Sequence, residues 1–133
     1  MRSACQAVAR RGFTLIELLV VMAIIATLLS IAAPRYFDHV DRARENSLRQ
    51  SLAVMRDAID KYRADTGRYP DSLETLVERR YLRALPKDPI TDDSRNWRLL
   101  PPPGGEADAE GGVWDVRSGA PGTARDGTPY ADW

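Results

Sequence analysis

The chain has 133 residues, 44% hydrophobic and 29% charged, and a formal net charge of zero, which fits one domain by length. Without a net positive charge, nucleic-acid binding is not indicated. The single cysteine, Cys5, lies ahead of the first apolar run. The rest of the chain therefore has no thiol for a disulfide or a thiolate metal site.

A basic leader, residues 1–12, precedes an apolar run over residues 13–33. Leu, Ile, Val, Met and Ala dominate the run, which is long enough to cross a bilayer because a spanning helix takes about 20 residues. The leader carries three basic residues, Arg2, Arg10 and Arg11. They predict a cytoplasmic leader and an exported chain from Arg35 onward, and their removal would leave a mildly acidic protein.

Glu17 is the one residue of this run that does not suit lipid. An unpaired carboxylate inside a membrane costs roughly 3 kcal/mol, and the run offers no partner. Secretory signals are cleaved after their apolar region, but here the basic pair stands directly before Gly12. A cut after Gly12 would keep the helix and create an amine near Glu17.

This arrangement resembles the class III signal of the type IV pilin and pseudopilin family. The matching residues are Gly12, Phe13, the segment 14–18 and Pro34 near the end of the run. The resemblance implies that a prepilin peptidase cleaves between Gly12 and Phe13 and methylates the new Phe13 amine. It also implies that Glu17 meets the Phe13 amine of a neighbouring subunit during assembly. A plain single-pass anchor that contains a glutamate is the alternative.

Helical periodicity resumes directly after Pro34, which predicts a kink there rather than a helix end. Between residues 35 and 66 the apolar side chains fall on one face: Val40, Leu48, Leu52, Met55, Ile59 and Tyr62. The opposite face is charged and, for most of its residues, solvated. Gly67 predicts the helix stop. Residues 13–66 should form one long helix, with a membrane part (13–34) and an amphipathic part (35–66).

After this helix, Gly67 and Pro70 predict a turn, and a short helix is expected at about residues 72–80, capped by Asp71 or Ser72. Leu73, Leu76 and Val77 should face the long helix. The string Thr66-Gly67-Arg68-Tyr69-Pro70 with Leu73-x-x-Leu76, and Pro86-Lys87-Asp88-Pro89, are similar to segments of the G-type pseudopilins of type II secretion. Asp88 is expected to bond nearby backbone.

Residues 90–133 predict a small sheet with loops. Strands are expected at Trp97–Leu100 and Val113–Arg117, with a possible third strand near Tyr130. The side chains expected to pack this sheet on the helix are Trp97, Val113 or Trp114, Val116 and Tyr130. The fold class is therefore α+β: a long N-terminal helix packed by a small C-terminal antiparallel sheet in a domain of residues 35–133, which the resemblance implies is a pilin or pseudopilin fold.

The resemblance also implies a calcium site in the C-terminal loop, built from acidic side chains and backbone carbonyls. Asp126 and Asp132 match that loop's acidic positions only loosely. The family's Ala-Asp-Gly is Ala120-Pro121-Gly122 here, so one expected ligand is missing. A metal-free loop closed by turns and by Trp133 packing is the alternative.

Catalytic groups are not indicated. No nucleophile–base pair, phosphate-binding loop or His/Cys cluster stands out, and the single histidine, His39, is expected at the surface. The chain is not expected to be an enzyme.

The resemblance implies a structural subunit of the type II secretion pseudopilus. Such a subunit assembles with further copies of itself into a homopolymer. Its other partners are further pseudopilins, prepilin peptidase, a cytoplasmic ATPase and an inner-membrane platform. The filament pushes folded proteins through the outer membrane. It is a single-pass protein of the bacterial inner membrane with its C-terminal domain in the periplasm. The alternatives are a type IV pilin, a minor or competence pseudopilin, and a membrane-anchored binding module that never polymerises.

Overall fold

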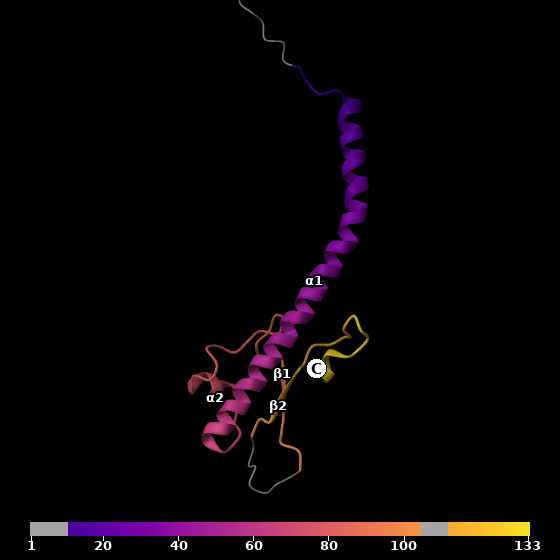
Figure 1. Cartoon of the computed structure of the whole chain (residues 1–133). Helices are drawn as coiled ribbons and strands as arrows, with labels where there is room; N and C mark the ends of the chain where they lie inside the picture. The colour runs from indigo at the N-terminus through magenta and orange to yellow at the C-terminus, as the bar shows by residue number, and fades with distance from the viewer. Residues whose placement is uncertain (1–10, 105–111) are drawn as a thin grey trace, which may run out of the picture. The chain divides into compact units, whose positions relative to one another are not determined.

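The computed structural model describes residues 11–104 and 112–133, so most of the predicted leader lies outside the described residues. Its elements are helix α1 (Leu15–Thr66), helix α2 (Leu73–Glu78), strands β1 (Trp97–Leu100) and β2 (Asp115–Ser118), and the 3₁₀ helix η1 (Tyr130–Asp132) (Figure 1). One long helix and a two-stranded antiparallel sheet confirm the predicted α+β layout. By internal contacts the chain forms two compact units, residues 1–38 and 39–133.

The first unit consists of the N-terminal part of α1. The helix is long and apolar enough to cross a membrane, and none of its most apolar window is buried. It continues through Pro34, which has no N–H to donate to the Ser30 carbonyl. The hydroxyl of Ser30 donates to the Thr27 carbonyl at 2.7 Å, and that of Thr27 donates to the Ala23 carbonyl at 2.8 Å. The helix therefore does not end at Pro34, while the kink stays a prediction.

In the second unit, α1 supplies one wall of the hydrophobic core. The predicted stripe is almost wholly buried: Leu48, Leu52, Met55, Ile59 and Tyr62 are at most 3% exposed. Val40, at the N-terminal end of the predicted stripe, is only half-buried. The core continues into α2, β1, β2 and the segments around them, with Leu73, Leu76, Leu82, Trp97, Val113 and Val116.

Helix α2 is shorter than the predicted 72–80. Ser72 caps it by accepting a hydrogen bond from the Thr75 N–H at 3.3 Å. The helix ends after Glu78 because Arg80 is left-handed, with φ of 64°, and the Tyr81 N–H turns back to the Leu76 carbonyl at 2.8 Å. No glycine marks this end. As predicted, the apolar face of α2 is turned to the core, with Leu73 and Leu76 buried and Val77 packed against it.

Strand β1 has its predicted bounds, and β2 differs from its predicted bounds. The antiparallel register pairs Trp97 with Ser118 and Leu100 with Asp115. Val113 lies outside β2 because its N–H donates to the Pro70 carbonyl at 2.8 Å instead of to β1. It is nevertheless the buried member of the pair of candidates, while Trp114 is 41% exposed.

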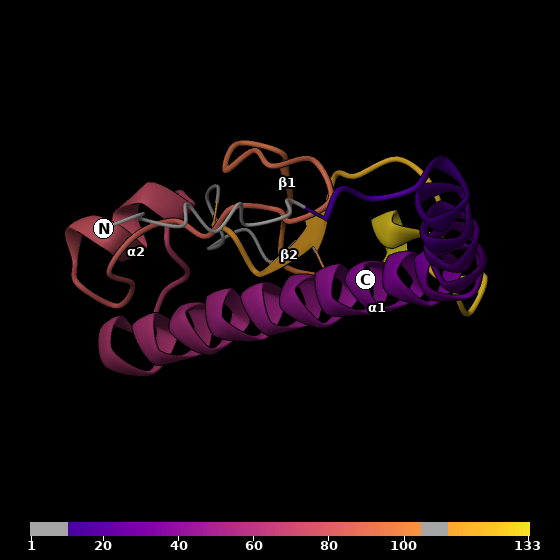
Figure 2. The same ribbon diagram turned by 90° about the horizontal axis from the view of Figure 1, so that it is seen from above.

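The possible third strand near Tyr130 is not formed. The chain there makes η1 instead, closed by the Trp133 N–H on the Tyr130 carbonyl at 3.1 Å. Within the second unit, α2, the two strands and the yellow C-terminal segment follow one another along α1 (Figure 2). The C-terminal segment thus lies against α1 around Glu45 and Arg49, at the N-terminal end of the buried stripe.

A buried carboxylate connects the loop before β1 to the end of β2. Asp88 is fully buried; its Oδ1 accepts from the Ile90 N–H at 2.8 Å, and its Oδ2 accepts from the Ser118 hydroxyl at 2.7 Å. The Ser118 oxygen in turn accepts from the Ala120 N–H at 3.0 Å. The expected bond to nearby backbone is present, and the bond to Ser118 is a long-range contact that the sequence did not indicate.

We expect Asp88→Ala to lower the free energy of unfolding by about 2 kcal/mol, because it leaves the Ile90 N–H and the Ser118 hydroxyl buried without their acceptor. Denaturant unfolding of the detergent-solubilised full chain measures this. The exposed Asp60 on α1 provides the matched control, and Asp60→Ala should change stability by about 0.5 kcal/mol or less. Equal losses in the two variants would contradict the role given to Asp88.

Candidate functional site

The predicted assembly residues lie at the start of α1. Phe13 and Thr14 precede the helix, and Glu17 lies in its first turn. The Thr14 hydroxyl accepts from the Glu17 N–H at 3.2 Å, which is an N-cap hydrogen bond. The positive end of the helix dipole favours a carboxylate at this place. The N-cap bond uses the amide of Glu17, and the predicted assembly role uses its carboxylate.

Around Glu17 the helix surface is apolar and open. Phe13 is 86% exposed, Leu15 78% and Ile16 71%, and the larger side chains as far as Ile31 are also exposed. Water is a poor environment for such a surface, which a bilayer or other apolar helices would cover. Among the described residues, Gly12 has no atom beyond its chain neighbours within 4 Å of the place where a side chain would stand. Cleavage after Gly12 stays a prediction.

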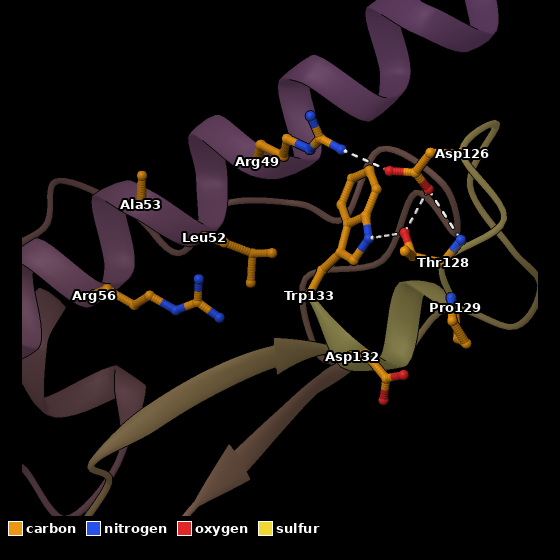
Figure 3. A pocket seen from close by; sticks show the side chains of 9 residues that line it. All are labelled: Arg49, Leu52, Ala53, Arg56, Asp126, Thr128, Pro129, Asp132 and Trp133. Atoms are coloured by element: carbon orange, nitrogen blue, oxygen red, sulfur yellow. Dashed lines mark hydrogen bonds and ion pairs between the residues drawn. The ribbon is translucent and has the colours of Figure 1, made fainter.

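A second candidate site lies where the C-terminal segment, residues 119–133, meets α1. Nine residues line an open groove of about 430 Å³ there (Figure 3). Arg49 of α1 stands over it. Its guanidinium lies 3.5 Å from Asp126 Oδ2 and 4.2 Å from the ring centroid of Trp133. The guanidinium is thus shared between a carboxylate and an aromatic face.

These partners are joined to each other through Thr128. Asp126 Oδ1 accepts from the Thr128 N–H at 3.0 Å and from its hydroxyl at 2.6 Å. The Trp133 indole N–H donates to the Thr128 hydroxyl oxygen at 2.8 Å. Arg49, Asp126, Thr128 and Trp133 therefore form a closed ring of contacts, which we call the Arg49 ring. The bonds from Thr128, and then the charge of Arg49, hold the pKa of Asp126 below its usual value.

Glu45, one turn before Arg49, attaches the same segment a second time. Its side chain is buried, and Oε1 accepts from the Arg125 N–H at 2.9 Å and from the Tyr130 hydroxyl at 3.4 Å. Burial, together with the Glu45 carboxylate, raises the pKa of Tyr130. The Glu45 carboxylate is therefore bound by two donors of the same chain.

Arg56 makes a third connection from α1, in this case to β2. Its Nε lies 2.7 Å from Asp115 Oδ1, and its Nη2 donates to the Val116 carbonyl at 2.9 Å. The helix face that was expected to be mainly solvated thus carries two arginines with long-range partners, Arg49 and Arg56.

The calcium prediction requires oxygens that are free to turn to a metal. Both carboxylate oxygens of Asp126 already face protein partners, and Asp132 is exposed on the rim of the groove. Among the described residues no three His, Cys, Asp or Glu side chains stand together as a metal site would need. Ca²⁺ takes six to eight oxygens, so a site at Asp126 would have to draw most of them from backbone carbonyls and water. Calcium binding itself stays untested.

Sequence reasoning missed Glu45, Arg49 and Thr128. Glu45 alone left a signal: it precedes Leu48 by three residues and so continues the alternation of threes and fours along the buried stripe. A carboxylate in that register has to find donors. Arg49 and Thr128 have no local signal, because their partners come from the other end of the chain.

Comparison with known families finds two matches. Residues 8–33 match the prokaryotic N-terminal methylation motif, and residues 35–101 match protein G of the type II secretion system. The first match covers the predicted cleavage point, Glu17 and the whole apolar run. The second covers α1 from residue 35 onward, α2 and β1, about half of the chain.

Individual relatives agree. The chain is 32% identical over 109 residues to type II secretion system core protein G of Klebsiella pneumoniae, covering 70% of this chain and 76% of the relative. It is 30% identical over 128 residues to the protein of the same name from Escherichia coli K12, covering 84% and 82%. Fimbrial protein EcpC of Eikenella corrodens is 39% identical over 61 residues, which is 46% of this chain and 40% of that one.

No solved structure matches the chain. With its N-terminal methylation motif, its long helix with an exposed apolar part, and its likeness to core protein G over most of its length, this chain belongs to the protein G family of type II secretion systems.

Proposed function

We propose that this chain is a structural subunit of the type II secretion pseudopilus, a filament that grows from the inner membrane and pushes folded proteins through the outer membrane. The observation that carries this proposal is the match of residues 35–101 to protein G, directly after a methylation motif. The role is mechanical, and the chain catalyses nothing itself.

The subunit would first wait in the bacterial inner membrane, anchored by the apolar part of α1, with residues 35–133 in the periplasm. Prepilin peptidase would cut between Gly12 and Phe13 and methylate the Phe13 amine. The exposed apolar side chains of residues 13–31 support the membrane anchor of this proposal. They have no partner within the described chain and suit lipid or other helices.

Assembly would then bring the Phe13 amine of one subunit to Glu17 of the next. A buried carboxylate is costly alone and far less so beside an opposite charge. This pairing would favour the transfer of a subunit from lipid into the filament. Neighbours in the filament would be further copies and other pseudopilins, added at an inner-membrane platform driven by a cytoplasmic ATPase.

The alternative functions differ in whether they need Glu17 and in which family the domain of residues 35–133 should match. A type IV pilin, a minor pseudopilin or a competence pseudopilin would share the assembly step, and the likeness to fimbrial protein EcpC covers 46% of this chain. The domain match to protein G favours secretion over these. A binding module that never polymerises would not need Glu17.

We expect Glu17→Gln to reduce filament material at least tenfold. The substitution removes the charge that would pair with the Phe13 amine, and about 1.4 kcal/mol of lost pairing already gives a factor of ten. The measurement is an immunoblot of sheared surface filaments from a secretion-competent host that lacks its own protein G.

Glu78→Gln is the matched control, because Glu78 is an exposed glutamate outside the apolar run. It should assemble like wild type, with equal amounts of both variants in the membrane fraction. Normal filaments from Glu17→Gln would contradict the proposed assembly step.

The intact mass of the membrane-extracted protein should correspond to residues 13–133 plus one methyl group. The reason is that cleavage after Gly12 removes the leader and frees the amine that is methylated. Gly12→Val should stay at full length, and a steric clash would not explain this, since among the described residues no atom beyond the chain neighbours lies within 4 Å of the added Cβ. A wild-type chain that still begins at Met1, or one cut after Ala33, would contradict the proposal.

A further inference from the structure

The C-terminal segment of this protein reaches α1 through two attachments of opposite charge. Arg49 brings a cation to Asp126, and Glu45, four residues earlier, brings an anion to the Arg125 N–H and the Tyr130 hydroxyl. Residues four apart lie on the same face of a helix. One face of α1 therefore presents both groups to the same segment.

The segment is also closed by hydrogen bonds between its own backbone groups. The Ala124 N–H donates to the Thr128 carbonyl at 2.7 Å, and the Gly127 N–H donates to the Ala124 carbonyl at 3.0 Å. The Tyr130 N–H reaches the Gly122 carbonyl at 3.2 Å. These bonds fix the backbone that presents Asp126 and Thr128 to Arg49.

Asp126, one of the two acidic residues of the predicted calcium site, belongs to the Arg49 ring. A divalent ion at Asp126 would have to replace the Thr128 donors on one oxygen and the guanidinium on the other. It would also stand close to the fixed positive charge of Arg49, which repels it. The stacked Trp133 ring covers the guanidinium on a further side and offers no oxygen.

We propose that Arg49 supplies the cation that holds the C-terminal loop, with Glu45 as the second attachment, so that this subunit folds independently of calcium. The loop is closed by a side chain encoded in α1 instead of by a bound metal. The proposal concerns the folded monomer and does not depend on filament formation, so its failure and that of the proposed function are separate results.

Thermal unfolding of the full chain in detergent tests the proposal, followed by circular dichroism with chelator or with about 5 mM calcium, above the millimolar affinities of extracellular calcium modules. The Tm of wild type should be the same in both to within about 1 °C. Arg49→Ala should lower the Tm by about 5 °C in both, because it removes the ion pair and the aromatic contact together.

Lys61→Ala is the matched control, since Lys61 is also an exposed cation of α1 and pairs with Asp57 one turn away. It should lower the Tm by about 2 °C or less. Arg49→Lys keeps the charge but loses the planar stacking on Trp133 and should fall between wild type and Arg49→Ala.

Hydrogen exchange localises the effect. In Arg49→Ala the amides of residues 119–133 should exchange faster, while those of α2 keep the wild-type rate. A wild-type Tm that rises several degrees with calcium, or slower exchange in residues 119–133 on adding it, would overturn the proposal. So would an Arg49→Ala variant that matches Lys61→Ala in both measurements.

Discussion

The dominant constraint on this protein is an apolar helical surface that its own chain leaves uncovered. The side chains from Phe13 to Ile31 have no described core to join. A membrane satisfies them, but it does not satisfy the carboxylate of Glu17. A neighbouring copy with a free Phe13 amine would satisfy both, because it brings an apolar helix and a positive charge together. The same surface that requires a membrane thus also favours a filament.

Beyond Pro34 the apolar positions of α1 face the core of the domain instead of lying exposed. Its buried positions are spaced by threes and fours from Leu48 to Tyr62, and they hold α2 and the sheet. One step earlier in this register stands Glu45. At Glu45 the contact between α1 and the domain changes from apolar packing to hydrogen bonds. The reason is that the C-terminal segment, which Glu45 contacts, is mostly exposed and offers few apolar side chains.

What the sequence predicted well was periodic or local. The long helix, the cap at Ser72 and the bounds of β1 all follow from patterns within a few residues. The end of α2 was missed because an arginine, Arg80, takes the left-handed position that glycine usually marks. The start of β2 and the missing third strand depend on the partners that Val113 and Tyr130 find elsewhere, at Pro70 and at Gly122. These hydrogen-bond partners come together only in the folded chain, so no local sequence pattern predicts them.

The two halves of the chain carry different kinds of information. Residues 8–33 match a general prokaryotic N-terminal methylation motif, and residues 35–101 match protein G of the type II secretion system. The N-terminal match therefore indicates the class of N-terminal segment, and only the second match indicates the secretion system. The match to protein G covers residues 35–101, and the C-terminal segment beyond it is attached to α1 by Glu45 and by the Arg49 ring. If Arg49 supplies the cation that holds this loop, as we propose, a change at that attachment would leave the apolar residues 13–33 unaltered, so the two halves of the chain could vary separately.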